Sequence, residues 1–335
     1  MNNRFKRQQG LTLVEVMVSL IVGAVILAGV MFTYIGMKGT TRDTLTIGEL
    51  QETGRLALDI MTADIAQAGF WGTFYESSFT AANTTVPAAP ANDCQSGLNN
   101  GSFPDGSTVE FRYIFAITSA GGPQLNCIDD TIANSDILQV KRLDGQNVAP
   151  GATNAQRFYF LAAQNRAEFS DSPAAVLPRP DATLWPYSHH VYYVQEQTFQ
   201  VQGQTRVIPT LMRNRLTTGA GGAAPIQSDV IMEGVENIHL LFGLDTNGDS
   251  RVDQYSTSNT MTVEQWQQQT AKVLTVQISI LVRSLTPDPG LNLRNQTYQL
   301  GGTNGRELTF NDEFRRAVFT STVQLRNVGE NLWAI

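Results

Sequence analysis

The spacing of hydrophobic positions changes once along this 335-residue chain, near residue 70. Residues 11–35 form an almost continuous apolar run with a single charged residue, Glu15. As a helix this run is about 37 Å long, which is enough to span a bilayer. Apolar residues then recur every three or four positions as far as Ala68, and Gly69 follows, as is common just after a helix end. The pattern predicts one helix over about residues 11–68.

The second half of this predicted helix is amphipathic. Its apolar stripe consists of Ile47, Leu50, Gly54, Leu58, Met61, Ile65 and Ala68. We expect the stripe to pack on a globular head. Glycines at 23, 29, 36, 39, 48 and 54 each weaken the helix by roughly 1 kcal/mol relative to alanine, which predicts local bending or unwinding on assembly. The alternative is that these small residues allow close packing in lipid.

From Phe70 onward the pattern is that of strands separated by Gly-, Pro-, Asn- and Ser-rich loops. The predicted strands are Val109–Ile117, Asp136–Leu143, Arg157–Ala162, Val191–Val201, Thr205–Arg213, Val235–Phe242, Val273–Arg283 and Val318–Arg326. The predicted loops are 80–107, 144–155, 171–187, 217–228 and 286–305. A run of strands after one helix predicts an α+β fold, with a long helix packed on a mostly antiparallel head.

The first ten residues are basic, with Arg4, Lys6 and Arg7 and no acid, so they should stay on the cytoplasmic side of a membrane. An ordinary secretory signal has its small-residue cleavage site after a short apolar core. Here the small residue, Gly10, precedes a long core. Cleavage between Gly10 and Leu11 would keep the helix and place Glu15 one turn from the new N-terminus.

The motif Gly10-Leu11-Thr12-Leu13-Val14-Glu15 resembles the class III signal of type IV prepilins. The resemblance implies cleavage after Gly10 by a prepilin peptidase and N-methylation of Leu11. It also implies that Glu15 pairs with the N-terminal amine of a neighbouring subunit, which would supply the partner that a carboxylate in hydrocarbon requires. The alternative is a plain signal anchor with an accidental acid.

Three further stretches, residues 57–72, 231–249 and 314–329, resemble minor pilins of the PilW family. The resemblance implies a non-enzymatic subunit that joins other minor pilins, the major pilin and the inner-membrane assembly platform. Such a complex primes pilus assembly and caps the tip. A type II secretion pseudopilin and a tip adhesin that binds a surface ligand are the alternative functions.

The resulting organisation is a leader (1–10), a transmembrane helix (11–35), its amphipathic continuation (36–69) and a β-rich head (70–335). We expect a single pass through the bacterial inner membrane, a periplasmic head and later incorporation into a pilus, at its tip. Removing the leader takes three bases and no acid from 23 basic and 30 acidic residues, so the net charge falls from −7 to −10. This charge argues against a nucleic-acid partner.

The only two cysteines, Cys94 and Cys127, follow the anchor and would therefore lie in the oxidising periplasm. We expect them to form one disulfide. A metal or redox pair would need closer spacing or further ligands. The three histidines fall in no known metal or catalytic motif, and adjacent His189 and His190 should face opposite sides of a strand. No enzymatic activity and no required cofactor are predicted.

One loop has the spacing of a calcium ligand set. Asp245, Asn247, Asp249 and Asp253 stand at relative positions 1, 3, 5 and 9, and the Arg251 carbonyl stands at position 7, as in EF-hand-type loops. Ser250 replaces the usual glycine, and Ser256 replaces the final acid. The pattern predicts a weak Ca²⁺ site, and the alternative is an Asx-rich hairpin turn.

Overall fold

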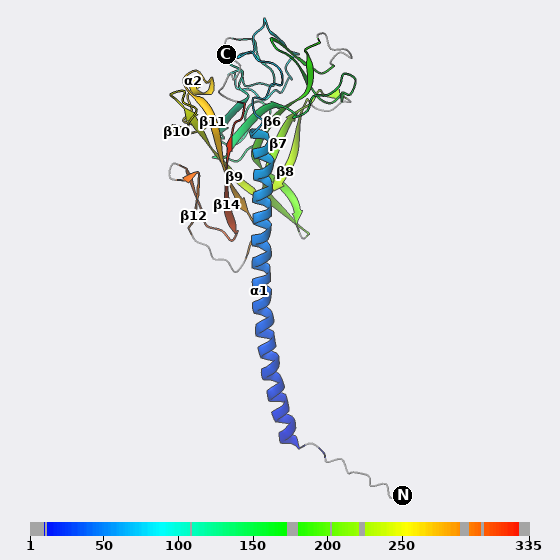
Figure 1. Ribbon diagram of the computed structural model, residues 1–335. Helices are drawn as coiled ribbons and strands as arrows, with labels where there is room; N and C mark the ends of the chain where they lie inside the picture. Colours follow the sequence, from blue (N-terminus) through cyan, green and yellow to red (C-terminus); the bar gives the residue numbers. More distant parts are fainter. Residues whose placement is uncertain are drawn as a thin grey trace, which may run out of the picture. The chain divides into compact units, whose positions relative to one another are not determined.

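The computed structural model in Figure 1 describes residues 10, 12–107, 109–172, 180–201, 203–220, 225–288, 295–302 and 305–327. The chain divides into two compact units, Met1–Glu49 and Leu50–Ile335.

One continuous helix, α1 (Leu13–Ile65), belongs to both units and begins and ends within a few residues of the predicted limits. Within the described residues it is the one helix long and apolar enough to cross a membrane, by length and composition. Its buried residues are Leu50, Gly54, Ala57, Leu58, Met61, Asp64 and Ile65. Ile47 is 46% exposed, so the buried stripe begins at Leu50, three residues later than predicted.

Gly69 ends the turn that follows α1. Its φ of 71° lies in the left-handed region that favours glycine. Its N–H donates to the carbonyl of Lys141 at 3.1 Å, so this turn is joined directly to the head. The glycine that the sequence places after the helix therefore has a defined role in ending it.

Among the described residues, the larger sheet of the head has eight strands. Its strand pairs are antiparallel, except for β1 and β5, which are parallel. The strands are β1 (Thr84–Thr85), β2 (Ile114–Thr118), β3 (Asp136–Leu143), β4 (Tyr159–Ala163), β5 (Arg166–Ser170), β6 (Thr183–Val201), β7 (Gln204–Leu216) and β8 (Ile226–Glu233). They follow the order β1-β5-β4-β6-β3-β2, and the long hairpin β6–β7 carries β8 at its side.

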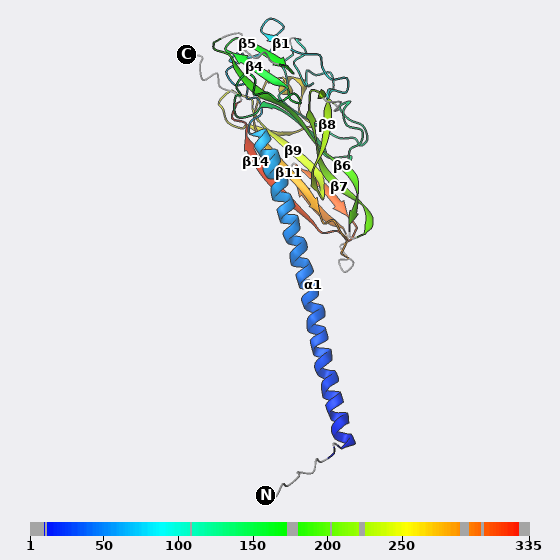
Figure 2. The same ribbon diagram turned by 90° about the vertical axis from the view of Figure 1, so that its right-hand side faces the viewer.

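The smaller sheet is antiparallel, in the order β10-β9-β11-β14. Its strands are β9 (Val235–Asp245), β10 (Gln254–Thr257), β11 (Lys272–Arg283) and β14 (Arg316–Gln324). A short helix, α2 (Val263–Trp266), precedes β11, and β12 (Gln296–Leu300) and β13 (Arg306–Phe310) form a separate hairpin. Figure 2 shows β9, β11 and β14 side by side in the head.

The core lies between these elements and takes its residues from alternate positions. On β11, Val276, Ile278 and Ile280 are fully buried on one face. They pair with Phe242, Leu240 and Ile238 of β9, and both sets belong to one hydrophobic cluster with the buried stripe of α1. Period-two alternation therefore places one face of the smaller sheet in the core.

The α+β class and the mostly antiparallel head are confirmed. The predicted strand Asp136–Leu143 matches β3. Of the predicted strand Val109–Ile117, only the part from Ile114 onward belongs to a strand, β2, which continues to Thr118. Strand β6 begins at Thr183, inside the predicted loop 171–187, and β1 lies inside the predicted loop 80–107. Strands β8 and β12 also begin inside segments that were predicted to be loops. Their burial patterns are mostly half-buried or exposed, so they lack the apolar signal by which a strand is recognised.

Candidate functional site

Gly10, the first residue of the predicted cleavage site, precedes α1. Gly10 is exposed, and a β-carbon placed there would meet nothing within 4 Å. Leu11 lies outside the described residues. Thr12 caps α1, because its side chain accepts a hydrogen bond from Glu15 N at 3.3 Å. Gly10 and Thr12 thus precede the helix, and cleavage between Gly10 and Leu11 stays a prediction.

Glu15 lies in the first turn of α1 and is exposed. Ion pairs within the described parts of the chain do not include it. The same helix surface carries small residues: Ser19, Gly23 and Ala24 line a shallow groove together with Val16, Leu20 and Leu27. Small residues allow helices to approach closely in lipid. A carboxylate beside such a surface suits pairing with another subunit, which also stays a prediction.

Cys94 and Cys127 form a disulfide, as predicted. The carbonyl of Cys94 accepts a hydrogen bond from Gln139 Nε2 at 2.7 Å, and that of Cys127 accepts one from Asn214 Nδ2 at 2.9 Å. The bridge therefore joins two loops that are also tied to β3 and β7. Closing 33 residues of chain stabilises the fold by on the order of 3 kcal/mol through the unfolded state.

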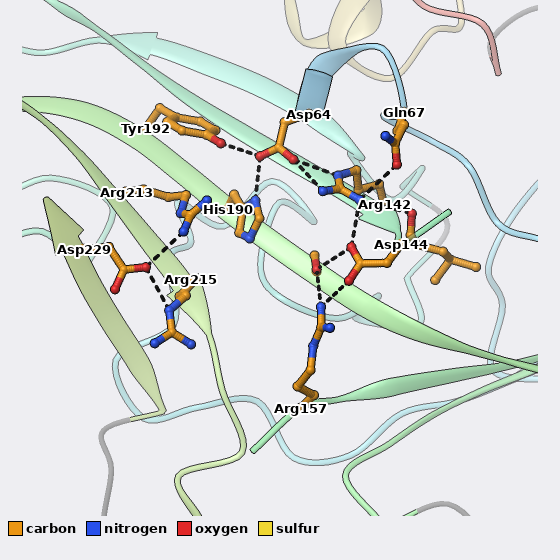
Figure 3. A network of polar contacts seen from close by, with 12 residues as sticks. Asp64, Gln67, Arg142, Asp144, Arg157, His190, Tyr192, Arg213, Arg215 and Asp229 are labelled. Atoms are coloured by element: carbon orange, nitrogen blue, oxygen red, sulfur yellow. Dashed lines mark hydrogen bonds and ion pairs between the residues drawn. The ribbon is translucent and has the colours of Figure 1, made fainter. Parts of the chain in front are cut away.

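A buried carboxylate fixes the end of α1 to the larger sheet (Figure 3). Asp64 is 5% exposed, and its Oδ1 accepts a hydrogen bond from Arg142 Nε of β3 at 2.8 Å. Its Oδ2 lies 2.5 Å from His190 Nδ1 of β6 and also accepts a hydrogen bond from the Tyr192 hydroxyl. Two strands thus hold the last turn of the helix. Figure 3 shows all three side chains converging on Asp64.

The pKa of Asp64 lies well below its usual range. Burial opposes ionisation, but the hydrogen bond and charge of His190 outweigh it, together with the charge of Arg142. Burial and the Asp64 carboxylate raise the pKa of Tyr192. At neutral pH Asp64 is therefore ionised, and the Tyr192 hydroxyl keeps the proton that it donates.

The network continues outward from Arg142. Its Nη1 donates to Gln67 Oε1 at 3.0 Å and to Asp144 Oδ1 at 2.8 Å, and Asp144 also pairs with Arg157. Positive and negative side chains alternate from the helix end to Arg157, just before β4, so each charge in this row has a neighbour of opposite sign. This group of side chains was not predicted from the sequence. Its signal was an acid three residues after Met61 and four before Ala68, on the buried stripe of the helix.

The adjacent histidines face opposite sides of β6, as predicted. His190 contacts Asp64, whereas His189 is 1% exposed and its Nδ1 lies 3.0 Å from Ser102 Oγ. Burial lowers the pKa of His189 well below its usual value, and the neighbouring Lys141 contributes. The described parts of the chain contain no group of three or more His, Cys, Asp or Glu side chains that could hold a metal ion.

Lys141 of β3 is fully buried beneath the loop that precedes β2. Its Nζ donates to the carbonyls of Asn100 and Arg112 at 3.0 and 2.7 Å. Burial lowers the pKa of Lys141 to about 7; Asp93 opposes this shift and Arg112 adds to it. This lysine is a buried hydrogen-bond donor that joins the loop to the sheet.

The predicted calcium loop connects β9 and β10. Asp245 accepts hydrogen bonds from the amides of Gly248 and Ser250 at 2.6 and 2.9 Å, which lower its pKa against the effect of burial. Ser250 has a φ of 62°, so it takes the conformation for which such loops use glycine.

The remaining predicted ligands are also engaged within the loop. Asn247 Oδ1 accepts a hydrogen bond from Asp249 N at 2.9 Å, and Asp249 Oδ1 accepts one from Arg251 N at 2.9 Å. Asp253 Oδ2 accepts one from Thr246 N at 2.8 Å. The oxygen side chains therefore have the order of a calcium loop, but the acids do not gather as a metal-binding group. Calcium binding stays a prediction.

Two segments of this chain match models of known protein families. Residues 5–31 match the family model of the prokaryotic N-terminal methylation motif, and residues 191–327 match that of type IV pilus-assembly protein W (PilW). A type IV-like pilin from Thermus thermophilus is similar to this chain, with 13% sequence identity and a TM-score of 0.36; the match covers 84% of this chain and 98% of that pilin. No curated protein matches significantly.

The methylation motif and the apolar α1 that leads into a sheet-rich head make this chain similar to type IV pilins. Within that class the chain is PilW-like, as the sequence indicated.

Proposed function

We propose that this protein is a minor pilin of the complex that primes type IV pilus assembly and remains at the pilus tip. The observation that carries the proposal is the PilW match over residues 191–327 behind an N-methylation motif at 5–31. The same match favours a pilus subunit over a type II secretion pseudopilin. Its role is structural and not enzymatic.

The anchor supports each step of this role. The prepilin peptidase cleaves after Gly10, and the methylated amine of Leu11 and the carboxylate of Glu15 then meet complementary groups on neighbouring pilins. The apolar residues of α1, exposed along the first unit, are held by the inner membrane before assembly and by other helices afterwards. The head, residues 70–335, lies in the periplasm, where the disulfide persists.

The Asp64 network gives the head a mechanical role. If the assembly platform pulls on this subunit through its helix, the load must pass from α1 to the sheets. Asp64 contacts side chains of β3 and β6, and these strands pair with each other and with β2, β4 and β7. We infer that this contact transmits the load, because the buried pair resists separation from both strands.

Deletion of the gene, with complementation by the wild type and by Glu15→Leu, tests the proposal. We expect few or no pili in the deletion strain, restoration by the wild type, and poor restoration by Glu15→Leu at normal membrane levels. The native protein should co-purify with other pilins, identified by mass spectrometry. Normal piliation in the deletion strain, or co-purification with secretion components alone, would contradict it.

A further inference from the structure

The outer edge of β14 has no hydrogen-bond partner among the described residues. On one side β14 pairs with β11 without a register shift. The pairing runs from Gln324 opposite Thr275 to Arg316 opposite Arg283. The order β10-β9-β11-β14 leaves its other side at the edge of the sheet. Such an edge carries a row of unpaired backbone N–H and C=O groups, which can form hydrogen bonds with a strand from another chain.

Two hydrogen bonds just beyond the ends of β14 fix which backbone groups face outward. Ser284 N donates to Arg315 O at 2.8 Å, and Leu325 N donates to Leu274 O at 2.8 Å, so residues 315 and 325 face β11. Directions alternate along an antiparallel strand, so the odd-numbered residues between them also bond to β11, and the even-numbered residues face the free edge. The exposed residues of this outward set are Thr320, Thr322 and Gln324.

This edge lacks the features that normally keep edge strands apart. Proline, lysine, an inward charge or a bulge usually blocks pairing, but residues 317–324 contain no charge and no proline, and the pair with β11 has no bulge. The other long edge strand, β8, does have such protection. Its pairing with β7 is interrupted by a bulge, and the strand itself contains the charged residue Asp229. The β14 edge is therefore suited to accept a strand.

We propose that residues 318–324 of β14 bind an extended strand from another pilin-like subunit. Main-chain hydrogen bonds from the outward residues supply the affinity, as in other cases of strand addition. The mature chain has a net charge of −10, so two copies repel each other, which favours a less acidic subunit over a second copy. This inference rests on the proposed minor-pilin function.

Proline substitution tests the edge in the full chain. Thr322→Pro removes one outward N–H and leaves the bonds to β11 intact, because proline is tolerated on that side of an edge strand. Val230→Pro is the matched control: Thr217 N donates to Pro225 O at 2.7 Å, so the even-numbered residues of β8, as far as Val230, face outward. Val230 is also exposed, at 51%.

We expect Thr322→Pro to reduce co-purified pilins and pili about tenfold, the effect of losing about 1.4 kcal/mol of binding, while the level of the chain itself is unchanged. Val230→Pro should leave both unchanged. Equal loss in the two variants, or no loss in either, would overturn strand addition. Loss of pili on deletion of the gene, but not in Thr322→Pro, would contradict strand addition alone and leave the minor-pilin function intact.

A photo-crosslinking amino acid in place of Thr322 identifies the occupant without a change in backbone. We expect a crosslink to a pilin-like subunit of different sequence, and no such crosslink from position 230. A crosslink to a second copy of this chain, or to no pilin at all, would overturn the proposal.

Discussion

Gly54 of α1 and Phe319 of β14 lie so close that a β-carbon on residue 54 would stand 2.2 Å from the phenylalanine ring. Three ring atoms lie within 2.6 Å of that position, including Cγ, so a rotation of the ring tip would not relieve the clash. The part of α1 from Leu50 onward therefore packs closely on the smaller sheet, and glycine at residue 54 leaves room for the Phe319 ring. Both views show this part of the helix beside β14 (Figures 1 and 2).

Gly54→Ala should destabilise the head by up to about 2 kcal/mol. The clash costs about 1–3 kcal/mol, and the higher helix propensity of alanine offsets part of it, by roughly 1 kcal/mol. Urea unfolding of the purified protein in detergent measures the change. Gly48→Ala is the control, because a β-carbon at residue 48 meets nothing within 4 Å and should be neutral or stabilising. Equal effects at the two positions would contradict this packing.

Asp64→Asn should lower the free energy of unfolding at pH 7 by roughly 3 kcal/mol, the low end for a broken buried ion pair, since it removes the buried charge while Arg142 keeps its second partner, Asp144. The pKa of Asp64 is lower in the folded than in the unfolded state. Its contribution is therefore fully present above the unfolded pKa, near 4, and is lost as the pH falls through the folded pKa. The difference between wild type and variant should shrink below about pH 4. A pH-independent difference would contradict the role of the charge.

Lys141→Met tests the buried lysine through pH. The folded pKa is about 7, below the unfolded value near 10.4, so between these values the unfolded chain binds one more proton and stability rises with pH. We expect the wild type to gain on the order of 4 kcal/mol relative to the variant from about pH 7 to 10.5. Thermal unfolding of both proteins across this range measures it, and parallel profiles would contradict a low lysine pKa.

Calcium at millimolar concentration should raise the melting temperature of the protein by a few degrees, by mass action on the folded state. Mg²⁺ should do less, because it is stricter about its geometry. Asp249→Ala should abolish the calcium effect. Asp105→Ala is the control, because that side chain also accepts a loop amide, from Ser107, but lies outside the calcium loop. An unchanged melting temperature would leave the loop as an Asx-rich hairpin.

The anchor and the strongest strands could be predicted from the sequence because their signals are local. The span of α1 follows from a continuous apolar run and a terminal glycine, and β3 from eight residues rich in apolar and β-branched side chains. β8 was missed because its side chains are mostly half-buried or exposed at the edge of the sheet. An edge strand needs little apolar sequence, so its pairing is fixed by its neighbours.

The polar networks could not be predicted because they join residues far apart in the chain. Asp64 meets His190 across 126 residues, and no spacing rule relates them. The sequence did show that His189 and His190 face opposite sides of a strand, but not which side chains they contact. An acid on the buried face of a helix indicates that a partner exists, since a buried charge requires one, and only the fold identifies it.

The most direct test of the account is the N-terminus of the protein extracted from membranes or pili. Mass spectrometry of its first peptide should show a chain that begins at Leu11 and carries one methyl group on its amine. Gly10→Val should keep the leader and block entry into pili. A chain that still begins at Met1, or one that begins beyond the apolar run, would contradict the assignment of this protein as a type IV prepilin.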